Sequence, residues 1–165
     1  MHDYSITFAC YNSVEYTKKC VNSLMASGTL MSRVVVVDNG SHDGTQNYLK
    51  TQPFGEVIFN KTNLGCGIAW NQGALAQQAE WTIIMNNDVL VTRGWAERLI
   101  ESARELDVRV ISPAMIEGPL DYDFQEFAEE AERRMSGVSR LGAKHAVCLA
   151  VHKSVWEDIG YFTPK

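Results

Sequence analysis

Apolar and polar positions follow one another along the chain in blocks that predict strands alternating with helices. Residues 5–10 form a run of the length and character of a short buried strand. A helical pattern of apolar residues follows it to about Ser27, and Gly28 is expected to end that helix. Asn12, with Glu15 three residues later, matches a capping box at the helix start. The first unit of the chain is therefore predicted to be a strand followed by a helix.

The second unit begins with four consecutive valines at residues 34–37. A run of β-branched residues is typical of a central parallel strand that is covered on both faces. It ends in residues 38–41, a cluster of turn-forming side chains. A short helix over residues 45–50 and a strand over residues 57–59 are expected next, so the order of strand and helix repeats.

The remainder of the chain continues the alternation. Its expected elements are a helix over 68–78, a strand over 81–85, a helix from a cap at Thr92 to about 106, a strand over 108–111, an exposed acidic helix over 121–135, a strand over 147–151 and a helix over 154–159. Such an order predicts an α/β fold with a mostly parallel central sheet, right-handed crossovers and flanking helices. Ligands of such sheets bind beyond the carboxyl ends of the strands, so polar residues that follow the strands are candidates for a site.

Composition and charge narrow the class of protein. The length of 165 residues indicates one domain, residues 1–165. A net charge of −5 argues against nucleic-acid partners, which require excess Lys and Arg. The four cysteines include no CxxC pair, which disfavours structural zinc and fits reduced thiols. No apolar run approaches the roughly 20 residues that span a bilayer. We expect a location in the cytoplasm or, peripherally, at the inner membrane face.

Asp38 is the first candidate for ligand binding, because it directly follows the valine run. Residues 38–41, Asp-Asn-Gly-Ser, suit a turn on their own, so Asp38 can serve the backbone alone. Alternatively, its carboxylate accepts the ring N–H of a pyrimidine base or a ribose hydroxyl. Both interpretations remain open from the sequence.

A second candidate lies at Asn86-Asn87-Asp88, where three polar residues end an apolar strand. These residues either form a surface turn or hold a cation through the Asp88 carboxylate. Mg²⁺ and Mn²⁺ take few protein carboxylates when substrate phosphates and waters supply the other oxygens. One aspartate at a rigid, open sheet edge would satisfy that requirement.

Residues 63–67 form a glycine-containing loop that enters a helix, with Asn71 and Gly73 downstream. Glycines allow close approach of the backbone to a ligand, and a helix N-terminus favours anions, although many helices begin in this way. The loop lacks both the GxGxxG spacing and the lysine of a P-loop. Dinucleotide-binding and ATPase functions are therefore disfavoured.

Taken together, these segments resemble the family-2 glycosyltransferases of the GT-A architecture, a Rossmann-like type of nucleotide-diphospho-sugar transferase, and their rhamnosyltransferase-like branch. The resemblance covers nearly the whole chain. Its segments are Ser5–Asn12 as the opening strand and nucleotide loop, residues 34–45, residues 63–73, Asn86–Asp88 in place of the DxD metal motif, and Gly142–Phe162 on the acceptor side.

This resemblance implies transfer of a hexose from a UDP or dTDP donor to a hydroxyl of a glycan, lipid-linked sugar or protein. The reaction would be inverting and would depend on Mn²⁺ or Mg²⁺. Asp38 would contact the base, Asn87 the ribose or sugar, and Asp88 the metal. The residues implied in nucleotide binding are Ala9, Cys10, Tyr11, Asp38, Asn39, Asn63, Gly65, Asn71 and Asn87.

Two departures from the family pattern matter. Asn86 replaces the first acid of the metal motif, which removes one charge. Family members also place an acidic pair shortly after the Gly-aromatic-Phe segment, here residues 160–162, whereas this sequence is expected to lack the C-terminal acceptor and base segment. The catalytic base is therefore unknown. Asp121, Asp123 and Glu126 are the available substitutes.

The missing base keeps a second function open, a non-catalytic module that binds nucleotide sugars or an inactive, truncated transferase fragment. A sugar nucleotidyltransferase shares a related sheet and is a third possibility. That class requires a glycine-rich loop with a basic residue directly after the first strand. Residues 10–13, Cys-Tyr-Asn-Ser, provide none.

Overall fold

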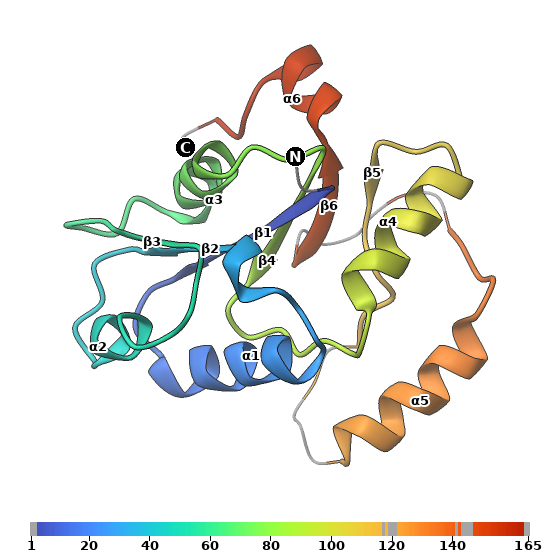
Figure 1. The fold of residues 1–165 in the computed structure, drawn as a ribbon, viewed down its shortest axis with the longest axis horizontal. Helices are drawn as coiled ribbons and strands as arrows, with labels where there is room; N and C mark the ends of the chain where they lie inside the picture. The colour runs from blue at the N-terminus through green and yellow to red at the C-terminus, as the bar shows by residue number, and fades with distance from the viewer. Residues whose placement is uncertain (1–2, 117, 119–121, 141, 143–146, 164–165) are drawn as a thin grey trace.

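The strands form one six-stranded sheet in the order β3-β2-β1-β4-β6-β5 (Figure 1). The computed structural model describes residues 3–116, 118, 122–140, 142 and 147–163. The strands are β1 (Tyr4–Cys10), β2 (Val34–Asp38), β3 (Glu56–Phe59), β4 (Trp81–Asn86), β5 (Val110–Ile111) and β6 (Cys148–His152). The helices are α1 (Val14–Ala26), the 3-10 helix η1 (Met31–Arg33), α2 (Thr45–Leu49), α3 (Cys66–Ala76), α4 (Trp95–Glu105), α5 (Phe124–Met135) and α6 (Lys153–Ile159).

The predicted α/β class with a mostly parallel sheet is confirmed. Strands β1 to β4 are parallel to their neighbours in this set, whereas β6 pairs antiparallel with both β4 and β5. The valine strand β2 is buried along its whole length between β1 and β3, as its composition predicts. The direction of β6 was not predictable, because a short apolar run has the same sequence pattern in either orientation.

Pairing register places the carboxyl ends of three strands side by side. Ala9 of β1 lies opposite Asn86 of β4, and Cys10 lies opposite Asp38 of β2. Successive side chains of a strand point to opposite faces, so β1 contributes to two cores. Ile6, Phe8 and Cys10 pack with side chains of α1, α2 and α4, while Ala9 packs with the cluster around α3 and α6.

Figure 1 shows this layering, with α3 and α6 on one side of the sheet and α1 and α2 on the other. Gly28 ends α1 as predicted, since it adopts a φ of 84° that suits glycine. The Gly28 N–H donates to the Met25 carbonyl, and the Thr29 N–H donates to the Leu24 carbonyl. This pair of hydrogen bonds is the Schellman motif.

The helix cap predicted at Asn12 is wrong. Helix α1 begins at Val14, and its N-cap residue Ser13 makes no side-chain capping hydrogen bond. Asn12 and Ser13 both have positive φ, 57° and 59°, and the Asn12 Oδ1 accepts a hydrogen bond of 2.8 Å from the His42 N–H. Glu15 consequently has no capping box to complete. A hydrogen bond to a neighbouring loop has replaced the local bond that the pattern predicted.

The cap predicted at Thr92 is also wrong. Helix α4 begins at Trp95 and is preceded by Gly94, whose φ of 65° turns the chain into the helix. The Thr92 Oγ1 accepts a hydrogen bond of 3.2 Å from the Arg98 Nη2. The start of α4 is therefore set by a glycine turn.

The acidic helix predicted over residues 121–135 appears as α5, at the lower right of Figure 1, and Asp121 lies outside the described residues. The Asp123 Oδ1 caps it by accepting from the Glu126 N–H at 2.9 Å, and Ala128 is its one buried residue. Within the described ranges, no helix has the length and apolar character needed to cross a bilayer.

Candidate functional site

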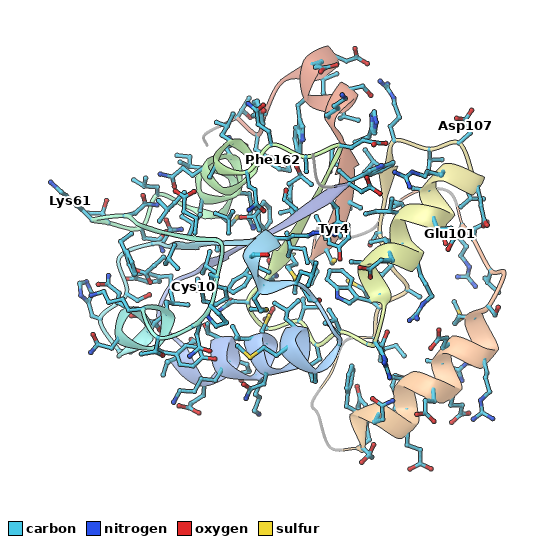
Figure 2. All side chains as sticks on the ribbon, viewed as in Figure 1. Tyr4, Cys10, Lys61, Glu101, Asp107 and Phe162 are labelled. Carbon is cyan, nitrogen blue, oxygen red and sulfur yellow. The ribbon has the colours of Figure 1, made fainter. Side chains whose placement is uncertain are left out.

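The carboxyl ends of β1, β2 and β4 bring together most of the residues expected in a ligand site. Figure 2 labels Cys10 at this end of β1 and Tyr4 at the opposite end. Tyr11 presents 47% of its side chain to solvent, and Asp88 is exposed, whereas Asp38 is fully buried. The edge therefore has an exposed aromatic ring and an exposed carboxylate above a buried polar layer.

Asp38 supports the turn that follows β2. Its Oδ2 accepts hydrogen bonds from the backbone N–H groups of Gly40 and Ser41, both at 3.1 Å, and from the Gln46 Nε2 at 2.8 Å. Gly40 has a φ of 79°, and a β-carbon there would lie 3.1 Å from the Lys61 carbonyl oxygen. Asp38 thus stabilises the turn formed by residues 38–41, which is one of its two predicted roles. Its carboxylate is buried beneath the sheet edge.

Asn39 begins a chain of carboxamides that fixes the glycine loop. Its Oδ1 accepts from the Asn60 Nδ2 at 2.9 Å, and its Nδ2 donates to the Gly65 carbonyl at 3.3 Å. Asn60 and Gln72 exchange two further hydrogen bonds of 2.8 and 2.9 Å. Asn60 and Gln72 were not among the residues predicted from the sequence. Asn60 directly follows β3, and polar residues that follow parallel strands lie at the ligand-binding edge of such sheets. The same reasoning that identified Asp38 and Asp88 could therefore have found Asn60.

The loops after β1 and β2 are joined by polar contacts. The Asn12 N–H donates to the Ser41 Oγ at 2.7 Å, and the Val14 N–H donates to the Asp43 Oδ2 at 2.9 Å. Asp43 also accepts from the Thr45 N–H and hydroxyl. Slight burial opposes ionisation, but these hydrogen bonds lower the pKa of Asp43 below its ordinary value. The loop that carries Tyr11 is therefore held against the turn at Asp38.

The glycine loop leads into α3, and no side chain of the described residues caps the first N–H groups of this helix. The Asn63 Oδ1 accepts from the Gly65 N–H at 2.9 Å, and Gly65 adopts φ 85° and ψ 160°, a conformation available to glycine. The first N–H groups of a helix have no partners within the helix and carry the positive end of its dipole. The start of α3 is therefore suited to an anionic group, as the sequence predicts.

Gly73 has a packing role. A β-carbon at this position would lie 1.8 Å from the Thr7 Oγ1 and 2.7 Å from the Thr7 Cβ. The glycine lets α3 lie directly on β1, which positions the start of that helix at the sheet edge.

The three polar residues at the end of β4 and directly after it have different environments. The Asn87 Nδ2 donates to the Thr17 Oγ1 of α1 at 3.0 Å, so this carboxamide supports the loop from the α1 side. Asn86 is half-buried and its N–H donates to the Val147 carbonyl at 2.9 Å. Asp88 is exposed, and within the described part of the chain it has no side-chain hydrogen bond or ion pair.

The fit of a divalent cation to this edge follows from the environment of Asp88. The described residues contain no group of three or more His, Cys, Asp and Glu side chains that could hold a metal ion. A cation here would thus have one protein carboxylate, with phosphate and water oxygens as its remaining ligands. Mg²⁺ and Mn²⁺ accept that arrangement when a diphosphate is bound, so Asp88 fits the expected cofactor.

Cys10 lies under the site as a neutral thiol. Burial raises its pKa, and the nearby Asp38 carboxylate, 3.8 Å from the sulfur, raises it further. A protonated, buried thiol is a poor nucleophile. Cys10 therefore contributes packing and backbone groups to the edge.

Asn71, expected in the donor pocket, has both side-chain polar atoms engaged elsewhere. Its Nδ2 donates to the Phe162 carbonyl at 2.7 Å, and its Oδ1 accepts from the Phe162 N–H at 3.0 Å. The partner residue belongs to the segment Gly142–Phe162, of which residues 143–146 lie outside the described part of the chain.

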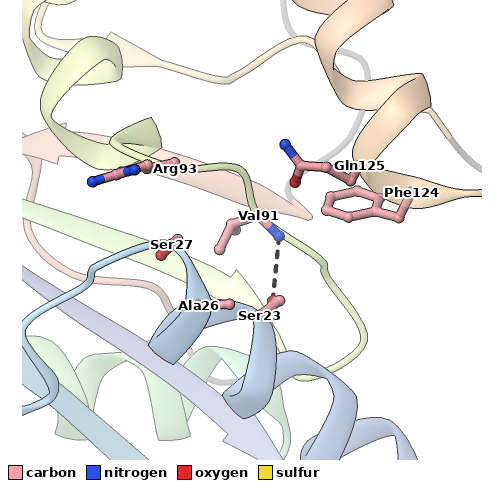
Figure 3. Close-up of a pocket in the computed structure, with 7 residues that line it drawn as sticks. All are labelled: Ser23, Ala26, Ser27, Val91, Arg93, Phe124 and Gln125. Carbon is pink, nitrogen blue, oxygen red and sulfur yellow. Dashed lines mark hydrogen bonds between the residues drawn. The ribbon is translucent and has the colours of Figure 1, made fainter.

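A pocket of about 200 Å³ lies away from this edge (Figure 3). It is lined by Ser23, Ala26, Ser27, Val91, Arg93, Phe124 and Gln125. The Val91 N–H in its wall donates to the Ser23 Oγ at 3.3 Å. None of the residues expected in nucleotide or metal binding lines it, so we place the candidate site at the open sheet edge.

Comparison with known proteins identifies the family of the chain. Residues 5–152 match glycosyl transferase family 2. An uncharacterized glycosyltransferase of Rickettsia conorii is 30% identical over 105 residues, which are 62% of this chain and 17% of that protein. Glycosyltransferase AglE of Haloferax volcanii is 24% identical over 172 residues, which are 96% of this chain and 55% of that protein. The chain thus spans about half, or less, of these relatives' lengths.

Solved structures share the fold. The mannosyltransferase PcManGT from Pyrobaculum calidifontis, in complex with GDP-Man and Mn²⁺, has a TM-score of 0.72 at 19% identity, over 99% of this chain and 48% of that one. TarS 1-349 of S. aureus in complex with UDP has a TM-score of 0.69 at 18% identity, over 99% of this chain and 51% of that one.

Proposed function

Because this chain belongs to glycosyl transferase family 2, we propose that its sheet edge binds a nucleoside-diphosphate sugar through a divalent cation held by Asp88. The sugar is then transferred to a hydroxyl of a glycan, a lipid-linked sugar or a protein. The proposed nucleotide is UDP or dTDP. Mn²⁺ or Mg²⁺ is the proposed cofactor.

One observation carries the proposal, namely the exposed Asp88 carboxylate, which follows the end of β4 and has no side-chain partner among the described residues. Other polar side chains of this edge are occupied by the protein itself, as Asp38, Asn39 and Asn87 illustrate. A carboxylate left open on a rigid strand end is available for an external cation. The solved neighbours that contain GDP-Man with Mn²⁺, or UDP, support a donor of this class.

The remaining site residues divide into groups that touch the donor and groups that shape its surroundings. Backbone groups of Ala9, Cys10 and Tyr11 flank the nucleotide, and the Tyr11 ring is exposed beside them. Asn63 and Gly65 present the uncapped start of α3 to the diphosphate. Asp38 acts on the nucleotide through the turn that it holds. When bound, the cation stabilises negative charge on the departing diphosphate.

An inverting transfer also needs a base to take the proton of the acceptor hydroxyl. The Asp123 Oδ1 caps α5 by accepting a hydrogen bond, and Glu126 is exposed in the first turn of that helix. Asp121 lies outside the described residues. The base therefore has no assignment, and this keeps the second candidate function, a nucleotide-sugar-binding module without catalysis.

A binding experiment tests the donor site. We expect UDP or dTDP to bind the wild type at least about tenfold more tightly with Mn²⁺ than without it, a difference of about 1.4 kcal/mol in calorimetric titration. Asp88→Asn should abolish that difference. Asp107→Asn is the matched control, because Asp107 is an exposed carboxylate in a positive-φ turn after α4 that asparagine tolerates.

Four outcomes separate the possibilities. An Asp88→Asn variant that keeps the full effect of Mn²⁺ would overturn the metal role. Release of free nucleotide from UDP- or dTDP-hexoses would establish the enzyme, whereas metal-dependent binding without release would favour the binding module. Tight binding of GDP alone would correct the assigned nucleotide.

A further inference from the structure

The carboxamide of Asn71 holds a segment distant in the sequence. It contacts the N–H and the carbonyl of one residue, Phe162, at 3.0 and 2.7 Å, across a separation of 91 residues. Two hydrogen bonds to one residue's backbone fix both its position and its direction, as a neighbouring strand would. Asn71 thus forms a clamp that joins α3 to residues 160–163.

Aromatic packing closes around the same segment. The Phe162 ring lies 5.6 Å from Trp70 and 5.7 Å from Trp156, and Tyr161 stacks on Trp156 at 5.1 Å with an interplanar angle of 9°. We call these four residues, Trp70, Trp156, Tyr161 and Phe162, the aromatic wall. Trp70 and Phe162 pack in one cluster with Ala9, a residue of the candidate site.

The wall lies next to the start of α3. A β-carbon added to Gly67 would lie 3.5 Å from the Phe162 Cβ, which is ordinary van der Waals contact. Asn71 is five residues beyond Cys66, the first residue of α3, or about 7.5 Å along the helix at 1.5 Å per residue. The clamp and the wall therefore lie within two helical turns of the proposed diphosphate position.

We propose that Asn71 is a positioning residue, which fixes residues 160–163 as one wall of the donor site and does not itself contact the nucleotide. This inference rests on the proposed function. It follows from the two hydrogen bonds between the Asn71 carboxamide and the Phe162 backbone, and from the position of the Phe162 Cβ, 3.5 Å from where a β-carbon on Gly67 would lie. A ligand at the start of α3 packs against this wall and restrains it.

Amide hydrogen exchange measured by NMR provides the test. In the wild type, UDP with Mn²⁺ should slow exchange of the Phe162 amide. In Asn71→Ala this amide should exchange about fivefold faster or more, since one hydrogen bond of ordinary strength is lost. The response to the ligand should vanish as well. The His152 amide is the internal control, because it donates to the Arg109 carbonyl and lies outside residues 160–163.

Binding constants distinguish positioning from direct contact. The dissociation constant of UDP with Mn²⁺ should change by less than about twofold in Asn71→Ala, whereas Asp88→Asn should lose the metal effect and leave ligand-free exchange at Phe162 unchanged. Phe162→Ala provides a second variant, since it keeps the backbone hydrogen bonds and removes the ring. It should retain protection at residue 162 and lose the response to the ligand.

Several results would overturn the inference. One is loss of UDP affinity in Asn71→Ala as large as in Asp88→Asn, which would place Asn71 in direct contact with the donor. Another is wild-type binding of UDP without any change in Phe162 exchange, which would make the segment a packing element only. Absence of metal-dependent binding of UDP, dTDP and GDP to the wild type is a separate outcome. It would overturn the proposed function and, with it, the role of the aromatic wall in a donor site.

Discussion

Substitution of Gly73 by alanine should destabilise this protein although alanine is the better helix former. Gly73 lies in the interior of α3, where replacing glycine by alanine ordinarily stabilises a protein by about 1 kcal/mol. Here the new β-carbon would lie 1.8 Å from the Thr7 Oγ1, 2.7 Å from its Cβ and 3.2 Å from its Cγ2. Rotation of Thr7 about χ1 moves the oxygen and the methyl group but leaves the Cβ in place.

The magnitude follows from these distances. An ordinary carbon contact begins near 3.4 Å, so α3 or β1 must shift even after Thr7 has rotated. Overpacking of a core commonly costs about 1–3 kcal/mol and sometimes more. A shift of a whole helix against a strand belongs at the upper end of that range. After the gain of about 1 kcal/mol in helix propensity, the net loss should be about 2 kcal/mol.

Urea denaturation followed by tryptophan fluorescence measures this loss, and comparison of m values checks that the unfolding transition is unchanged. A loss of 2 kcal/mol corresponds to a fall in Tm of about 4–8 °C for a chain of this size. Gly67→Ala in the same helix is the control. Its β-carbon meets the Phe162 Cβ at 3.5 Å and should cost nothing.

A double-mutant cycle locates the cause. Thr7→Gly removes the Cβ together with the oxygen and the methyl group, so it should reduce the cost of Gly73→Ala by about 1–2 kcal/mol. Two results would refute the reasoning. One is a Gly73→Ala protein as stable as the wild type or more so, and the other is an equal loss in both Thr7 backgrounds.

Two further predictions concern titratable groups. Hydrogen bonds in the folded state lower the pKa of Asp43, so its contribution to stability is present above its ordinary pKa of 3.8 and is lost as pH falls through the lower folded value. Because Asp43 is exposed and solvent weakens its interactions, Asp43→Asn should cost no more than about 1 kcal/mol at pH 7. The difference should shrink below pH 4 in acid titrations of unfolding, and a constant difference would contradict this. Of the four thiols, only Cys66 is exposed, while burial raises the pKa of Cys20 and Cys148 to about 12. At pH 8 the native protein should thus react rapidly with a disulfide reagent at one thiol, and the unfolded protein at four. Rapid reaction of all four thiols in the native state would show that the other three cysteines are not buried.

Local patterns in the sequence determined most of the architecture. The four valines predicted a strand buried on both faces, and β2 is that strand. Gly28 predicted a helix end, and the Schellman hydrogen bonds are present there. Polar residues that follow parallel strands were predicted to share one edge of the sheet, and the register places Asp38 and Asn86 on either side of the end of β1. These predictions succeeded because burial and backbone preference are recorded in the spacing of neighbouring residues.

Tertiary structure alone decided the partners of those polar side chains that bond to distant parts of the sequence. Asn12 bonds to His42, 30 residues away, and therefore does not cap α1. The carboxamide of Asn71 holds Phe162, 91 residues away. The direction of β6 and the glycine contact between α3 and β1 are decided in the same way. A polar group bonds to whichever donor or acceptor the folded chain brings within about 3 Å, and no local pattern records a neighbour that arrives from another part of the sequence.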